Sequence, residues 1–221
     1  MDRIVDRDRE PVEFGRVLAL SDGIFAFAMT LLVISIVLPA GLPTAAFPEA
    51  LGRLMPKVAI MALSIAVVAS AWLWHHRLFR MLQRADGRLI GLNLAALGLV
   101  ALVPFPHQVL GDYPHEPLSY ALYAAVLGAL NLMTVVIDVH VHRHGLLRVP
   151  PSHAQFRREI VRGLVVTGAF GLSIPLAFVL VGLTPLMWLA VLPVENRLSR
   201  PAAPARAAPA ASPRRAPRAG R

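Results

Sequence analysis

Ionisable side chains inside apolar stretches are the features of this sequence most in need of a chemical explanation. The densest group is the segment Arg16-Val17-Leu18-Ala19-Leu20-Ser21-Asp22-Gly23, which opens a long apolar run. Charged groups in hydrocarbon are costly and call for a partner or a function. Arg16 and Asp22 are six residues apart and do not share a helical face. We therefore expect Asp22 to find its partner on another helix.

Candidate partners occur at a similar depth in the next two apolar segments: Trp72, His75 and His76 in one, and Asn93 in the other. Hydrogen bonds between such side chains hold membrane helices together. The cluster can therefore have a purely architectural role, fixing the first helix against its neighbours. The alternative role is a proton relay through Asp22 or a histidine.

The remaining polar patterns do not indicate metal or enzyme chemistry. His75 and His76 point about 100° apart on a helix and cannot hold one ion together. His140, His142 and His144 come where a helix should end, so we interpret them as interfacial, titratable side chains. Asp138 lies about one turn from that end and is expected to extend to the interface. The chain has no cysteine, and we find no phosphate loop, serine elbow or carboxylate pair. We expect neither an enzyme nor a bound cofactor.

Composition shows what must position these residues. Hydrophobic residues make up 56% of the 221 residues and charged ones only 16%, whereas soluble domains are typically about 25% charged. We predict an all-α integral membrane protein with six transmembrane helices, because about 20 apolar residues span a bilayer as a helix. The expected spans are 17–38, 58–74, 89–103, 118–139 and the stretch 160–194, read as two helices that turn near Gly182.

The arginines alternate along the chain as these spans require. Residues 1–16, 76–88 and 141–162 are rich in arginine, while 39–50, 104–117 and the turn near residue 182 have no lysine or arginine. Basic loops stay in the cytoplasm. The pattern predicts a bacterial cytoplasmic (inner) membrane protein with both termini inside. Arg53 and Lys57 do not follow it and are placed at the outer headgroup level.

The two ends are set apart from the membrane domain, which we assign to residues 14–196. Residues 1–13 mix acids and arginines and are expected to form a cytoplasmic lead. A cleaved signal peptide over residues 1–46 is the alternative, but the mixed charges and Asp22 disfavour it. Residues 197–221 are rich in Pro, Ala and Arg and should be a disordered basic tail. The net charge of +9 is better explained by topology and lipid than by nucleic acid.

The first apolar segment also carries a mixed stripe. Gly23, Phe27, Thr30 and Ile34 fall at i, i+4, i+7 and i+11 and share one helical face. Taken alone, this stripe is explained by ordinary helix packing, with Thr30 bonding the carbonyl four residues before it.

Several motifs together resemble a known family. Arg16-x-x-x-Leu20-Ser21-Asp22-Gly23 is similar to the R-x-x-x-F-S-D-G signature of the transmembrane protein 175 family of potassium channels, with Leu20 in place of the usual Phe. The segments Trp72-x-x-His75-His76-Arg77-Leu78-Phe79, Leu92-Asn93-Leu94 and Pro104-Phe105-Pro106 resemble later features of that family, in the same order. The resemblance covers about residues 14–194.

The resemblance implies a homotetramer of six-helix subunits with the first helix of each subunit lining a central pore. Phe27 then falls at the hydrophobic constriction, where the family more often has Leu or Ile. Thr30 supplies a hydroxyl to a transient potassium ion, and Ile34 lies one turn further out. Arg16, Ser21, Asp22, Trp72, His75 and Asn93 would anchor the pore helix. A ring of hydroxyls is a weak filter, so we expect modest selectivity.

The expected function is thus a potassium-permeable, weakly selective cation channel. The alternative is a proton-coupled secondary transporter that uses Asp22 and a membrane histidine, and a scaffold without transport is a third possibility. Glu49, Asp112 and Glu116 flank loops with few basic residues, and we expect them to concentrate cations at the outer mouth.

Overall fold

The structure, a computed structural model, describes residues 2–181, 184 and 187–188, and of these it describes side chains from Phe14 onward. This part of the chain is helical and contains no strand. Its elements are α1 (Asp2–Ile34), the short 3-10 helix η1 (Thr44–Ala46), α2 (Phe47–Met81), α3 (Gly87–Leu102), α4 (Pro104–Asp112), α5 (Pro117–Arg143) and α6 (His153–Val179).

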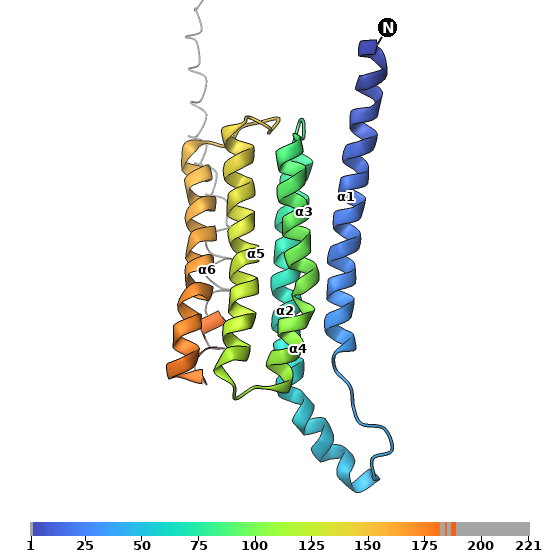
Figure 1. Cartoon of the computed structure of the whole chain (residues 1–221), viewed down its shortest axis with the longest axis vertical. Coiled ribbons are helices and arrows are strands. Elements are labelled where there is room, and N and C mark those ends of the chain that lie inside the picture. Colours follow the sequence, from blue (N-terminus) through green and yellow to red (C-terminus); the bar gives the residue numbers. More distant parts are fainter. Residues whose placement is uncertain (1, 182–183, 185–186, 189–221) are drawn as a thin grey trace, which may run out of the picture.

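The helices stand side by side in one bundle, with α1 at one edge and α5 and α6 at the other (Figure 1). α1 packs on α2, α3 and α4, whereas α5 packs mainly on α6 and α3. Five helical segments of the described residues are long and apolar enough to cross a membrane, counting α3 and α4 together as Gly87–Asp112. The predicted sixth span and the turn at Gly182 lie outside the described residues.

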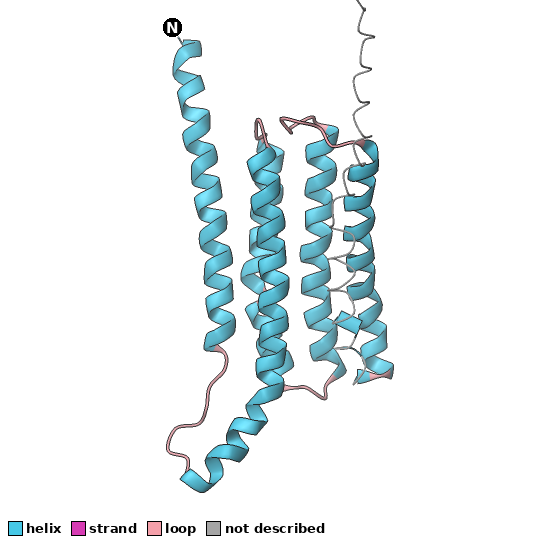
Figure 2. Ribbon diagram, turned by 180° about the vertical axis from the view of Figure 1, so that it is seen from behind, coloured by secondary structure: helices cyan, strands magenta, loops and turns pink. Residues whose placement is uncertain are grey.

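One predicted boundary was wrong and one helix was missed, both at prolines. The sequence placed the start of the second span after Pro56, but α2 begins at Phe47 and includes Pro56. Its first turns run away from the bundle at an angle (Figure 2), as expected for a proline inside a helix. Pro104-Phe105-Pro106 follows the end of α3 at Leu102, as predicted, but a further helix follows directly. Pro104 begins α4, because proline is well tolerated in a first turn, where its missing N–H is not needed.

The first helix is longer than predicted, since α1 is continuous from Asp2 through the segment that the sequence set apart as a lead. At its other end Ile34 is followed by an extended connection to η1. α1 is therefore one rod that projects beyond the neighbouring helices at the N-terminal end (Figure 1).

The α2–α3 and α5–α6 connections meet at the end of the bundle that carries most arginines, called here the arginine-rich end: Arg77, Arg80, Arg84, Arg88, Arg143, Arg148, Arg157 and Arg158. α5 stops there because Gly145 adopts a φ of +59°. The Leu146 N–H then reaches the Val141 carbonyl at 3.1 Å and the Gly145 N–H that of His142 at 3.3 Å, a Schellman ending.

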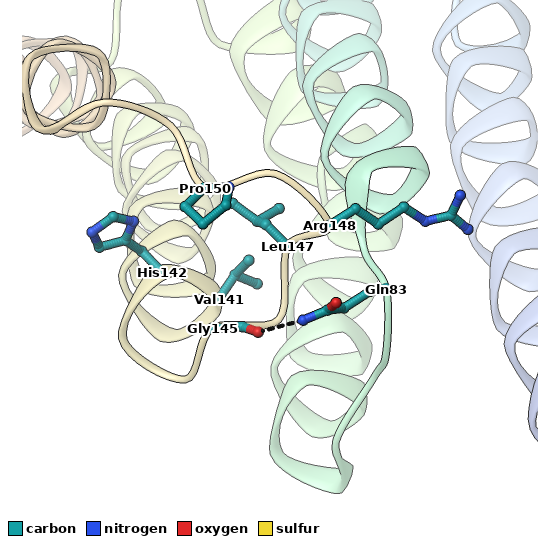
Figure 3. A pocket seen from close by; sticks show the side chains of 7 residues that line it. All are labelled: Gln83, Val141, His142, Gly145, Leu147, Arg148 and Pro150. Carbon is teal, nitrogen blue, oxygen red and sulfur yellow. Dashed lines mark hydrogen bonds between the residues drawn. The ribbon is translucent and has the colours of Figure 1, made fainter.

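The turn after α5 is bonded to the α2–α3 connection. Leu82 and Leu147 pair as a single antiparallel bridge, and Gln83 Nε2 donates to the Gly145 carbonyl at 2.9 Å (Figure 3). A cavity of about 260 Å³ lies beside this junction. Its lining is mixed: Val141, Leu147 and Pro150 are apolar, and Gln83, His142 and Arg148 are polar (Figure 3). The junction thus ties two connections together.

Asp86 begins α3 and also joins it to α5. Its Oδ1 accepts from the Leu89 N–H at 2.7 Å, and His140 Nε2 lies 3.0 Å from both carboxylate oxygens. Partial burial raises the pKa of Asp86, but the hydrogen bonds from Leu89 and His140 outweigh it and leave this pKa below its usual value.

Replacing Asp86 with Ala should lower the free energy of unfolding by about 1 kcal/mol, because α3 loses its N-cap. Asp86→Asn should lower it less, since asparagine caps well and only the contact with His140 changes. Because the folded pKa is depressed, the carboxylate stabilises the fold above pH about 4 and the effect fades as pH falls through the folded value. Thermal unfolding in detergent at several pH values measures this. A cost for Asp86→Asn equal to that for Asp86→Ala would contradict the capping role.

Candidate functional site

α1 has one buried face and one open face. Ser21, Phe25, Ala28 and Leu32 are all buried, and their spacing places them on one side. Phe27 and Ile34 are each 63% exposed on the other side, and Thr30 between them is also exposed. The three residues that the sequence assigned to the pore therefore share a face that no described part of their own chain covers.

The Thr30 hydroxyl has a defined orientation on that face. Thr30 Oγ1 donates its hydrogen to the Ala26 carbonyl at 2.9 Å, four residues back, as the sequence predicted. A hydroxyl that donates in this way keeps its oxygen lone pairs free to accept. The open face thus presents an oxygen ligand between two bulky apolar side chains.

The buried face of α1 is held by a polar chain that crosses three helices. Asn93 Nδ2, from α3, donates to Ser21 Oγ at 3.1 Å, and Ser21 donates in turn to the Val17 carbonyl at 2.8 Å. His75 Nε2, from α2, lies 2.9 Å from Asn93 Oδ1, to which it donates. All three side chains are at most 2% exposed. The chain gives each of these three side chains at least one hydrogen-bond partner in the apolar interior, while His75 Nδ1 is buried without one.

Aromatic rings surround His75 on both sides. The Phe79 ring stacks on the imidazole with centroids 4.0 Å apart, and the Phe25 ring lies at 5.6 Å. These rings fix the orientation of the imidazole that meets Asn93. Sequence analysis quoted Phe79 only as the end of a family motif and did not name Phe25, although their spacing from His75 and Ser21, four residues in each case, was a usable signal.

Asp22 has its own partner, separate from the buried chain. Trp72 Nε1 donates to Asp22 Oδ1 at 2.8 Å, and the Trp72 ring stacks on His76 with centroids 5.3 Å apart. Both Asp22 and Arg16 are exposed on α1. Arg16 makes no hydrogen bond or ion pair with another described residue, so the structure does not bring it into the network. The predicted partners of Asp22 are thus divided between two sets of contacts.

The histidines near the end of α5 are arranged differently from a ligand site. His140 faces Asp86, and its ring lies 4.2 Å from that of His144, while His142 stacks on Phe156. Among the described residues no three His, Cys, Asp or Glu side chains form a group that could hold a metal ion. Asp138 does not extend to the interface as expected: its Oδ2 accepts from Trp74 Nε1 at 3.2 Å, between α5 and α2.

At the end opposite the arginines, two of the three acids expected at the outer mouth have basic partners. Glu49 pairs with Arg53 one turn away on α2. Asp112 of α4 pairs with Lys57 of α2, with Lys57 Nζ 2.6 Å from Asp112 Oδ1. The two basic residues that broke the charge pattern therefore neutralise two of these acids, and the negative charge left at this end is smaller than the sequence suggested.

Comparison with known proteins identifies the family. The family model described as endosomal/lysosomal potassium channel TMEM175 matches residues 16–104, which include α3 and nearly all of the contacts of α1 just described. A potassium channel of Streptomyces collinus is 35% identical over 177 residues, covering 78% of this chain and 86% of that one. The chain belongs to the TMEM175 family.

Solved and animal relatives agree with this assignment. The crystal structure of a lysosomal potassium-selective channel TMEM175 homologue from Chamaesiphon minutus superposes with a TM-score of 0.74 at 26% identity, over 86% of this chain and all of the other. The human endosomal/lysosomal proton channel TMEM175 is 24% identical over 158 residues. This chain spans only 31% of the length of the human protein.

Proposed function

We propose that this protein is a potassium-permeable, weakly selective cation channel that assembles as a homotetramer, with the first helix of each subunit lining the pore. The observation that carries the proposal is the open face of α1. Phe27 would form the hydrophobic constriction, Thr30 the hydroxyl ring next to it and Ile34 the next ring outward. Relatives from Streptomyces collinus and Chamaesiphon minutus that are named as potassium channels support the same assignment.

The composition of this face favours a pore over a lipid contact. The exposed face of α6 carries Val165, Leu172, Phe178 and Val179, as expected for side chains that face lipid tails. The open face of α1 instead includes Gly23 and the Thr30 hydroxyl. Exposed polar groups within a span are expected to face water or protein rather than hydrocarbon. A central, water-filled pathway along α1 accounts for them.

The arrangement of the anchoring contacts fits a pore wall that must keep its shape. The Ser21–Asn93–His75 chain and the Asp22–Trp72 bond hold one side of α1 to α2 and α3, leaving the opposite side free for the pathway. We place Arg16 with this anchoring set, with a partner in the assembled channel. The arginine-rich end is assigned to the cytoplasm by the positive-inside rule, so that the Lys57–Asp112 end is outer.

Thr30→Ala is the substitution that tests the hydroxyl ring. Without the four oxygens an ion loses part of the ligand set that replaces its water. We expect the permeability ratio of potassium to sodium to fall by about twofold to fivefold, measured as reversal potential across planar bilayers containing the purified protein.

Thr134→Ala is the matched control, because Thr134 on α5 also donates its hydroxyl to a carbonyl of its own helix but lies away from α1. It should leave the ratio unchanged. Equal shifts from both variants would argue against a pore on α1. Saturable flux driven by a proton gradient and indifferent to Thr30 would instead favour the proton-coupled transporter.

A further inference from the structure

A second buried polar chain holds the outer end of α1, and it is separate from the contacts around Ser21. Ser35 Oγ, just beyond the last residue of α1, lies 3.0 Å from Nε2 of His107 on α4. The other ring nitrogen, Nδ1, lies 3.1 Å from Ser64 Oγ of α2. Ser64 Oγ is 2.8 Å from the hydroxyl of Tyr123 on α5. Four segments far apart in the sequence thus converge on one imidazole.

The chain lies in the apolar interior. Ser64 and Tyr123 are fully buried and His107 is only 3% exposed. Desolvating these groups costs free energy unless each finds a partner. Apolar side chains would fill the same space without that cost, so the polar groups here specify a particular arrangement of the four segments.

The hydrogens can be assigned around a neutral ring, which has one N–H. Nε2–H donates to Ser35 Oγ, and Ser35 donates to the Leu32 carbonyl at 2.7 Å. Nδ1 accepts from the Ser64 hydroxyl, which accepts from Tyr123. Protonating Nδ1 would turn the Ser64 hydrogen toward the Ile60 carbonyl, 2.9 Å away. Either charge state of the ring can therefore be hydrogen-bonded, but only the neutral state avoids a charge in this apolar site.

The ring lies next to the outer surface. A small cavity of about 10 Å³, close to the size of one water, is lined by His107, Ser35, Lys57, Gly111 and Asp112, among others. The Lys57 and Asp112 side chains are 35% and 46% exposed. Protons from the outer solution therefore have a short path to His107.

The titratable groups facing His107 do not favour a positive ring. Lys57 of α2 is itself cationic, and Asp112 of α4 is already paired with it. Tyr123 of α5 approaches through Ser64. Within the described residues, α1 and α3 present no titratable group at this contact. A proton on His107 thus adds repulsion with Lys57 and no new ion pair.

We propose that His107 is a positioning residue that fixes the outer end of the pore helix, and that its protonation from the outer solution reduces the permeation of cations. The effect on current rests on the proposed pore, whereas the anchoring of α1 does not. Protonation at Nδ1 leaves the Ser35–His107 bond in place and adds four positive charges behind the outer mouth of a tetramer. The repulsion of cations by these charges acts against conduction.

The test measures potassium current across planar bilayers while the outer solution goes from pH about 7.5 to about 4.5 at constant inner pH, a range wide enough to charge a ring that this site keeps neutral near pH about 6.5. Wild-type current should fall about threefold or more. In His107→Gln, which keeps a donor and an acceptor but does not titrate, the current relative to its own value at the higher pH should change by less than about 1.3-fold. His115→Gln is the matched control, since His115 is exposed in the loop after α4, and should keep the wild-type response.

A wild-type channel indifferent to outer pH, or a response removed by His115→Gln, would overturn the proposed pH effect. Amide hydrogen exchange at one fixed pH tests the anchor without any current. Ser35→Ala, a small truncation at a half-buried site, should speed exchange at residues 32–36 by about fivefold or more, and unchanged exchange would overturn the anchor. If exchange rises while current ignores Phe27 and Thr30, the proposed pore fails and the anchor stands.

Discussion

Phe27→Ala is expected to raise the unitary potassium conductance by about tenfold or more. Four phenyl rings around a narrow pathway exclude water, and an ion that has lost its water meets a large barrier. Alanine would widen the pathway and let water fill it. The fold should tolerate the change, because Phe27 is 63% exposed and covers no core of its own subunit. Single-channel recording in planar bilayers measures the conductance directly.

Phe178→Ala provides the matched control for this experiment. Phe178 is also a phenylalanine on a membrane helix and is 57% exposed, but it lies on α6 at the far edge of the bundle. Its removal should leave the conductance within about 1.5-fold of the wild-type value. An unchanged Phe27→Ala channel, or an equal gain from Phe178→Ala, would rule out a constriction at Phe27.

Hydropathy and arginine spacing predicted the all-helical class and most helix positions, because the bilayer imposes a fixed length and a charge asymmetry. Local sequence rules for the ends of helices failed at prolines. Pro56 was interpreted as a boundary but lies inside α2, whereas Pro104 follows the end of α3 as predicted but also begins α4, which was missed. Proline at a first turn and proline within a bent helix have the same local signature, and only the surrounding packing distinguishes them.

The two polar chains also differ in how far the sequence could predict them. Ser21, His75 and Asn93 could be grouped from sequence, because each is polar, lies near the same end of an apolar segment and belongs to a recognisable motif. Ser35, Ser64 and His107 carry no such motif. Serine is common in membrane helices, where it can bond its own backbone, so neither serine indicated a partner. These three residues come together only because α4 continues the chain after Pro104 as a helix. Sequence analysis had treated that segment as a connection between two spans.

The periodicity of the sequence also could not show which face of α1 is exposed. The stripe Gly23, Phe27, Thr30 and Ile34 was visible in the sequence, but its orientation was not. A stripe of this composition is equally compatible with a helix contact inside the subunit. The structure shows that the opposite face, with Ser21, Phe25 and Leu32, is the packed one. A polar chain on one side of α1 therefore leaves the mixed stripe free, and the two features depend on each other.

Asn93→Leu is expected to be the most destabilising single change in the anchoring network. Asn93 is fully buried, and leucine would leave Ser21 Oγ without its donor and the His75 Nε2–H without its acceptor. Each unsatisfied buried group costs about 1–3 kcal/mol, so we expect a loss of about 2–4 kcal/mol. Thermal or denaturant unfolding in detergent measures it. Asn131→Leu, which removes one longer bond of 3.3 Å to the Gly163 carbonyl, should cost about 1 kcal/mol.

A double-mutant cycle with Ser21→Ala distinguishes a connected network from independent packing. Once Asn93 is leucine, Ser21 Oγ no longer accepts from it, so removing the hydroxyl should cost less than in the wild type. We expect a coupling energy of about 0.5–2 kcal/mol. Additive effects would mean that the Ser21–Asn93 contact contributes little. Because the same contact orients α1, a variant that stays folded but loses this coupling should also show a broader distribution of single-channel conductances, as the pore-facing residues lose their fixed register.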